Sequence, residues 1–232
     1  MNFETERQMS ESIKKLVLFD LDGTLLDTLG DLTGAVNHIL GELGYPIRSA
    51  LEVRSYLGNG ARELVRLALP HAVEDKVLDE YLERYKKYYN AHSKIETKPY
   101  DGVVALLTEL KRRGVCTAVV SNKPDFATKE LCREYFGDLI DFAIGDREDV
   151  ERKPAADPIL LAMKTLDCGV AVHVGDSEVD VETAAKAGIP CVAVTWGFRD
   201  IDVLEDAGAK YFAADANDLK AHLFKLIEIE DN

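Results

Sequence analysis

The sequence predicts an α/β protein, in which helices flank a Rossmann-like parallel sheet and an all-helical cap is inserted after the first strand. Short apolar runs rich in β-forming residues alternate with helical patterns, which is typical of parallel strands joined by helices. The predicted strands end near residues 20, 120, 145, 174 and 195, and the helical patterns between them include residues 103–113, 129–135 and 179–187. Ligands of such open sheets bind outside the carboxyl ends of the strands, so function is expected there.

The cap is predicted because the strand pattern disappears between residues 28 and 97. Apolar side chains recur there at helical spacing, over residues 29–43, 49–56, 61–69 and 73–89. The predicted domains are therefore a catalytic core of residues 1–27 and 98–232 and a helical cap of residues 28–97. Both connections lie close to the first strand end, so we expect the cap to hinge over it.

The first strand end carries two carboxylates, Asp20 and Asp22, followed by Gly23. Alternation along a strand aims residues two apart to one side, and two nearby carboxylates repel unless a cation or a proton lies between them. One acid, kept ionised by a metal, can attack a substrate while its neighbour donates a proton to the leaving group. An ordinary Asp-Gly turn is the simpler alternative.

Three further motifs lie at or after later strand ends. Ser121 and Asn122 precede a predicted helix, where a hydroxyl and free N–H groups can cradle phosphate oxygens or simply cap the helix. Lys153 is followed by a proline, whose ring restricts the backbone next to the lysine. Asp176 ends a strand and Asp180 follows one helical turn later. Acids there can complement a helix dipole, but oxygen ligands from separate strand ends are also what Mg²⁺ requires.

These motifs together resemble those of the haloacid dehalogenase-like phosphohydrolase superfamily. That pattern is DxDGT, a serine at a strand end, a lysine and GDxxxD, and all four occur here in chain order. Within the superfamily, residues 27–32, 57–61 and 194–198 are most similar to the phosphoglycolate phosphatase group. Gly30 and Ala156 stand where that group often has proline, and neither is a catalytic position.

The resemblance implies a Mg²⁺-dependent phosphomonoester hydrolase that acts through an aspartyl-phosphate intermediate. Asp20 is the expected nucleophile. Asp22 is the expected general acid, which protonates the leaving alkoxide and later activates water. Lys153 supplies a fixed cation, since phosphoryl transfer demands charge neutralisation and positioning.

Three sets of residues complete the predicted site. The phosphate-binding set is Gly23, Ser121, Asn122 and Lys153. The metal-binding set is Asp20, Asp22 through its carbonyl group, and Asp176, with Asp180 expected to orient the metal shell or Lys153. The specificity set in the cap is Asn59, Gly60 and Arg62. An arginine there would pair with a substrate carboxylate, although a connecting turn and a solvated arginine are equally ordinary explanations.

The leading candidate substrate is 2-phosphoglycolate, ahead of pyrophosphate or a sugar phosphate. A sugar-phosphate mutase of the β-phosphoglucomutase kind would keep all four motifs, but its relatives carry a cap histidine where this chain has Leu32. A catalytically idle regulatory module of the same fold is the alternative from another class. The intact motif residues argue against it.

Composition narrows the expected partners to a small phosphorylated metabolite. The 232-residue chain has a net charge of −14 without a basic stripe, which disfavours nucleic acid and anionic membranes. Its four cysteines lack metal-ligand spacing and fit a reducing cytoplasm. Residues 1–15 are polar, unlike a signal peptide, and no later run is long enough to span a membrane. A monomer or a homodimer is expected.

Overall fold

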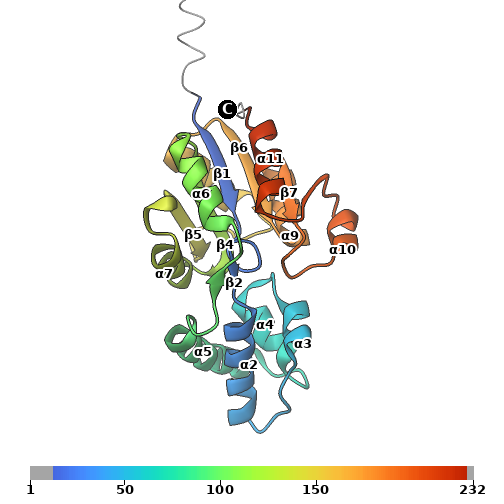
Figure 1. The fold of residues 1–232 in the computed structure, drawn as a ribbon. Coiled ribbons are helices and arrows are strands. Elements are labelled where there is room, and N and C mark those ends of the chain that lie inside the picture. The colour runs from blue at the N-terminus through green and yellow to red at the C-terminus, as the bar shows by residue number, and fades with distance from the viewer. Residues whose placement is uncertain (1–12, 229–232) are drawn as a thin grey trace, which may run out of the picture.

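The computed structural model describes residues 13–228, and its centre is a parallel sheet. Six strands follow the order β5-β4-β1-β6-β7-β8, and every neighbouring pair is parallel. The strands are β1 (Lys15–Phe19), β4 (Cys116–Pro124), β5 (Phe142–Asp146), β6 (Val170–Gly175), β7 (Cys191–Val194) and β8 (Tyr211–Ala213). The predicted α/β class is therefore confirmed (Figure 1). The polar N-terminal segment expected over residues 1–15 lies mostly outside the described residues.

Helices cover both faces of the sheet. They are α6 (Val103–Arg112), α7 (Asp125–Tyr135), α8 (Asp157–Leu166), α9 (Glu178–Ala187), α10 (Ile201–Asp206) and α11 (Ala216–Leu226), with a short 3₁₀ turn, η1 (Gly137–Leu139). Val17 and Phe19 of β1 join one apolar cluster with α6, α7 and α11, while Leu16 and Leu18 join another with α8. This strand is buried on both faces, which explains its unbroken apolar sequence.

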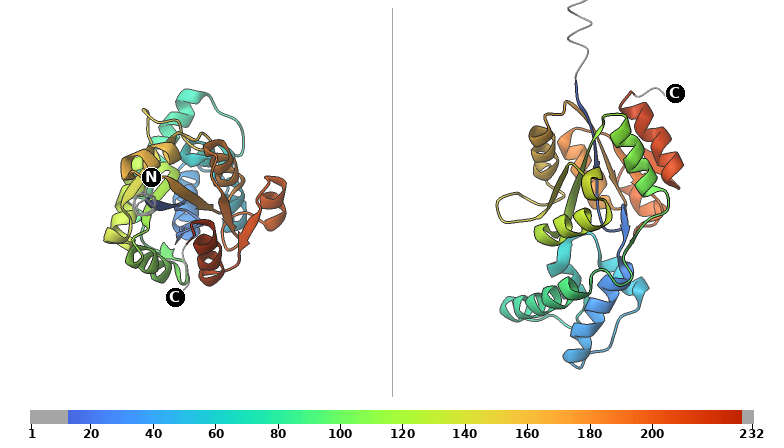
Figure 2. Two further views of the ribbon diagram at one scale, coloured as in Figure 1. Left: turned by 90° about the horizontal axis from the view of Figure 1, so that it is seen from above. Right: turned by 60° about the vertical axis from the view of Figure 1, so that its left-hand side comes forward.

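The cap consists of four helices that lie together at one end of the molecule (Figure 2). They are α2 (Leu29–Glu42), α3 (Ala50–Tyr56), α4 (Gly60–Ala68) and α5 (Asp75–His92). Their apolar faces form, with Phe198 of the core, a cluster separate from the two that flank the sheet. The cap joins the core through a two-stranded antiparallel ribbon, β2 (Leu26–Asp27) and β3 (Lys98–Pro99). The sequence pattern did not predict this ribbon, and the domain boundaries at residues 28 and 97 stay a prediction.

Asp31 fixes the start of the cap to its end. Its carboxylate accepts hydrogen bonds from the backbone N–H groups of Ile95, Glu96 and Thr97 and from the Thr97 hydroxyl, over 2.7–3.1 Å. Four donors on one buried carboxylate satisfy its hydrogen-bonding capacity without a cation. Both connections between cap and core are therefore held at one point.

Two further differences from the sequence pattern concern strands. β4 continues past residue 120 to Pro124, so Ser121 and Asn122 lie within the strand and not in a turn after it. β8 is three residues long, too short for an alternating pattern to reveal it. None of the helices in residues 13–228 combines the length and apolarity needed to cross a membrane.

Candidate active site

The carboxyl ends of β1, β4 and β6 open into a cavity that the cap covers. From the core, the cavity is lined by Asp20, Asp22, Ser121, Asn122, Lys123, Lys153, Asp176 and Ser177, together with Pro124, Ala127, Phe198 and Arg199. From the cap, it is lined by Leu32, Leu57, Gly58, Gly60, Ala61, Leu64, Tyr85, Lys86, Tyr89 and Asn90. Charged groups thus face a wall that is largely apolar.

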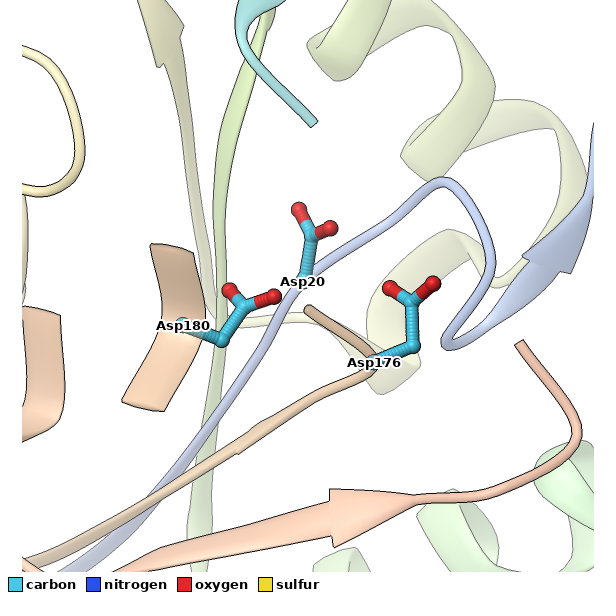
Figure 3. A group of neighbouring side chains, drawn as sticks. All are labelled: Asp20, Asp176 and Asp180. Carbon is cyan, nitrogen blue, oxygen red and sulfur yellow. The ribbon is translucent and has the colours of Figure 1, made fainter. Parts of the chain in front are cut away.

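Three carboxylates crowd together at one side of the cavity (Figure 3). Asp20 follows β1, Asp176 follows β6 and Asp180 lies in the first turn of α9, and each offers an oxygen within 4.8 Å of the others. Burial raises the pKa of Asp20 to about 6, although the Lys153 ammonium opposes this rise. Burial and the neighbouring charges of Asp20 and Asp180 hold the pKa of Asp176 well above its usual range. The cluster is therefore short of positive charge.

Asp176 is held in place by close backbone approach. The Thr24 hydroxyl donates to Asp176 Oδ1 (3.1 Å) and the Phe198 N–H donates to Asp176 Oδ2 (2.7 Å). Gly23 has a φ of +85°, and a Cβ atom there would lie 2.3 Å from Asp176 Oδ2. A Cβ at Gly197 would lie 2.2 Å from the Asp176 side chain. Both positions require glycine because the carboxylate is packed against them.

Asp180 orients Lys153. Its Oδ1 lies 2.7 Å from Lys153 Nζ and 3.0 Å from His173 Nε2, and its Oδ2 accepts from the Ser177 N–H (3.2 Å) and hydroxyl (2.6 Å). The same ammonium lies 2.9 Å from Asp20 Oδ1. Burial would raise the pKa of Asp180, but Lys153 and His173 hold it well below its usual range. Burial alone would lower the pKa of Lys153, but the negative charges of Asp180 and Asp20 raise it above its usual value.

The donor set fits a hard divalent cation. Three buried carboxylates cluster here, and the Lys153 ammonium pairs with two of them, Asp20 and Asp180, so negative charge remains in excess. Carboxylate oxygens from separate strand ends are the ligands that Mg²⁺ and similar ions prefer. Both oxygens of Asp180 already accept two contacts each, which leaves Asp20 and Asp176 as the better ligands.

Asp22 also lines the cavity, where it lies against Lys123, a residue that the sequence pattern did not single out. Lys123 Nζ lies 3.0 Å from Asp22 Oδ1 and 2.9 Å from Asp22 Oδ2. It also lies 4.5 Å from the ring centroid of Tyr89, which belongs to α5 of the cap. Ser121 and Lys123 are two residues apart in β4, so alternation could have placed Lys123 on the face of Ser121.

The predicted phosphate-binding residues fall into two groups. Ser121, Asn122 and Lys153 line the cavity, whereas Gly23 packs against Asp176. The Asn122 side chain donates to the carbonyl groups of Gly58 (3.1 Å) and Lys153 (3.0 Å), so it ties a cap turn to the lysine loop. The backbone N–H of Asn122, and not its side chain, is therefore the group that matches the predicted contact with phosphate.

The predicted specificity residues also divide. Gly60 lines the cavity, whereas Asn59 is the N-cap residue of α4 and lies outside the wall of the described cavity. Arg62 pairs with Asp75 (2.9 Å) and Asp79 (3.2 Å) of α5. Because these partners lie on the outer surface, the position of Arg62 does not support the expected pairing with a substrate carboxylate.

The α3–α4 turn is one part of the cap that side chains of the core hold in place. Arg199, after β7, donates to the carbonyl groups of Leu57 (2.6 Å) and Arg54 (3.4 Å) and pairs with Glu178 (2.7 Å). Arg54 in turn donates to Asp200 of the core (3.0 Å). Sequence reasoning missed Arg199, because a lone arginine after a strand carries no local signal.

Comparison with known proteins agrees with this geometry. The family model described as haloacid dehalogenase-like hydrolase matches residues 17–194. A phosphoglycolate phosphatase of Pseudomonas savastanoi pv. phaseolicola is 37% identical over 202 residues, which cover 84% of this chain and 74% of that protein. Phosphoglycolate phosphatase 1 of Pseudomonas aeruginosa is 38% identical over 196 residues, covering 81% and 71%.

A solved structure extends the similarity to three dimensions. The crystal structure of a candidate phosphoglycolate phosphatase from Lactobacillus delbrueckii subsp. bulgaricus superposes with a TM-score of 0.84 at 31% sequence identity. The match covers 91% of this chain and 98% of that one. Core and cap are therefore both shared with that protein.

Proposed function

This chain belongs to the haloacid dehalogenase-like hydrolase family and is a phosphatase, and we propose that it hydrolyses 2-phosphoglycolate or a similar small phosphorylated metabolite with Mg²⁺ as cofactor. One observation carries the proposal. Asp20 lies 2.9 Å from the buried Lys153 ammonium and clusters with Asp176, and all three line one cavity together with Asp22. The names of the curated relatives support phosphoglycolate as the substrate.

In the first half-reaction, the Asp20 carboxylate attacks phosphorus and the bond from phosphorus to the leaving oxygen breaks. Asp22 gives its proton to that oxygen, which leaves as an alcohol. In the second half-reaction, Asp22 takes a proton from water, the resulting hydroxide attacks phosphorus, and the Asp20 carboxylate is released with inorganic phosphate.

The remaining residues bind and neutralise the phosphoryl group. Lys153 supplies a fixed positive charge, and the Ser121 hydroxyl and the Asn122 N–H donate to equatorial oxygens. Mg²⁺, held by Asp20, Asp176 and the Asp22 carbonyl, would neutralise charge on the transferred group. Asp180 positions Lys153 and is not a proposed metal ligand.

Partners and location are proposed from charge and composition. A net charge of −14 favours a small metabolite over nucleic acid or an anionic membrane. The four cysteines are free, as in a reducing cytoplasm, which is the proposed location. The proposed assembly is a monomer or a homodimer.

A phosphate-release assay tests the proposal. The panel contains 2-phosphoglycolate, pyrophosphate and β-glucose 1-phosphate, each measured with Mg²⁺ and after chelation. We expect the highest kcat/KM on 2-phosphoglycolate and loss of turnover on chelation. Asp20→Asn should lower kcat by about 10⁴-fold, whereas Asp138→Asn, at an exposed aspartate of η1, should not.

Three results would contradict parts of the proposal. Full activity of Asp20→Asn would exclude the aspartyl-phosphate, and full activity after chelation would exclude the metal. Equal slow turnover of every ester would exclude a dedicated phosphoglycolate phosphatase. Formation of glucose 6-phosphate from β-glucose 1-phosphate would favour a mutase.

A further inference from the structure

We propose that Lys123 selects phosphomonoesters whose leaving group carries a carboxylate one carbon from the ester oxygen. This inference rests on the proposed function and adds to it the residue that recognises the leaving group. It comes from three observations. Lys123 contacts the proposed general acid, the other basic residues of the cavity wall pair with groups elsewhere, and the cap side of the wall is apolar.

Lys123 lies where the general acid meets the cap. It is 6% exposed, and its ammonium contacts both carboxylate oxygens of Asp22 at 2.9–3.0 Å. The face of the Tyr89 ring lies on another side of the same ammonium, at 4.5 Å. All three residues line the cavity. A leaving group that receives its proton from Asp22 is therefore adjacent to a buried positive charge.

The other cations of the cavity wall have partners elsewhere. The wall contains four basic residues, Lys86, Lys123, Lys153 and Arg199. Lys153 lies between Asp20 and Asp180, on the side of the transferred phosphoryl group. Arg199 pairs with Glu178 and holds the cap turn, and Lys86 pairs with Glu83 at 2.8 Å. Lys123 is thus the cation of the described wall that lies beside the leaving group.

The cap wall makes such a cation necessary for an anionic leaving group. Leu32, Leu57, Leu64 and Tyr85 offer a carboxylate no compensating charge. A carboxylate buried against such side chains without a partner is strongly disfavoured. A neutral leaving group of the same size has no such requirement.

The geometry brings Lys123 within reach of such a leaving group. The Lys123 ammonium lies 2.9–3.0 Å from the oxygens of Asp22, the proposed proton donor. Because one carbon separates the ester oxygen from the substrate carboxylate, a leaving group whose ester oxygen contacts Asp22 also brings its carboxylate close to Lys123.

Matched esters test the proposal. The variant is Lys123→Met, and the substrates are 2-phosphoglycolate and its neutral amide, 2-phosphoglycolamide. We expect kcat/KM on the carboxylate ester to fall by about 100-fold and on the amide by about 10-fold or less, since the charge matters only to the carboxylate. Lys129→Met is the control, because this exposed lysine of α7 pairs only locally with Asp125.

Two further measurements cover the case in which Lys123→Met fails to fold. The unmodified protein should prefer 2-phosphoglycolate over the amide by about 100-fold. Lys123→Arg, which keeps the positive charge, should retain most of that preference.

The outcomes separate this inference from the proposed function. Equal losses on both esters in Lys123→Met would mean that Lys123 only holds Asp22, and would overturn the inference. Equal turnover of both esters by the unmodified protein would overturn it too, while leaving the phosphatase activity established. Failure to release phosphate from any ester would instead overturn the proposed function.

Discussion

The strand ends of the core and the inner face of the cap meet in one cavity but are built differently. At the strand ends, Asp20, Lys153, Asp176 and Asp180 are each at most 8% exposed and contact one another or neighbouring donors. On the cap face, the cavity wall is mostly apolar, and the cap's ionic groups lie mainly on its outer surface. Charge is concentrated on the core side of the cavity and is scarce on its cap side.

This difference separates two parts of the proposed reaction, the transfer of the phosphoryl group and the binding of the leaving group. Asp20 and Asp176 directly follow strands whose positions the hydrogen-bonded sheet fixes, and Lys153 pairs with Asp20 and Asp180, so the mutual distances of these groups depend little on the cap. The cap is joined by a short ribbon and by a few side chains that reach the α3–α4 turn. Changes in the core should therefore affect stability and kcat, and changes at the cap contacts should mainly affect KM.

The largest effect on stability is expected from Asp180→Asn in the core. This change removes the charge that holds Lys153, and breaking a buried ion pair typically costs 3–5 kcal/mol. We expect a loss of about 3 kcal/mol in the free energy of unfolding, because Asp20 still faces Lys153. A misplaced lysine should also lower kcat by about 10²-fold.

Urea unfolding and steady-state kinetics measure both effects. Glu182→Gln, an exposed acid on the same helix that pairs with Lys186, is the matched control and should change neither. If Asp180→Asn kept both stability and kcat, the core would not depend on its buried ion pairs, and the contrast with the cap would fail.

Most of the core site could be predicted because its signals are local. A buried strand gives an unbroken apolar run, and an acid directly after it, such as Asp20 or Asp176, stands out against that run. Parallel topology then brings the strand ends to one edge. Ser177 is three residues before Asp180 and contacts it locally as the N-cap of α9, whereas no spacing signal distinguishes His173, whose ring the fold places on Asp180.

A smaller effect is expected from Arg199→Met, which removes the grip of the core on the cap turn. The guanidinium donates to the Leu57 carbonyl at 2.6 Å, and a hydrogen bond from a charged group contributes about 1.5–3 kcal/mol. We expect KM for the substrate to rise by about 10-fold or more with a smaller change in kcat, because the cap must close without this contact.

Kinetics on 2-phosphoglycolate separate the two parameters, with Arg147→Met as control because this arginine pairs with the nearby Asp149 on the surface. A fall in kcat at constant KM would place Arg199 with the chemistry of the core and not with cap closure.

The pairing of Lys123 with Asp22 and the contacts between core and cap escaped prediction because they join residues far apart in the chain. Lys123 and Asp22, both in the core, are separated by 101 positions, and Arg199 and Leu57 of the cap by 142. Helical periodicity located the cap helices to within a few residues, since it depends on local spacing. It could not show which side of each helix faces the core and which faces a neighbouring helix.

The smallest effect is expected from Arg62→Ala, and it tests the comparison at its weakest point. Arg62 is predicted as a specificity residue because an arginine in the cap could pair with a substrate carboxylate, but its guanidinium pairs with Asp75 and Asp79, which are 89% and 61% exposed. Exposed ion pairs contribute little, because water and salt screen them. We therefore expect kcat/KM on 2-phosphoglycolate to stay within about twofold of the unmodified protein, as for Arg84→Ala, whose partner Glu42 is also a surface acid. A large rise in KM confined to Arg62→Ala would mean that the cap changes its arrangement when substrate binds and turns this arginine inward. Leaving-group recognition would then be shared between Lys123 and the cap. The contrast between a charged core side and an apolar cap side of the cavity would then hold only for the protein without substrate.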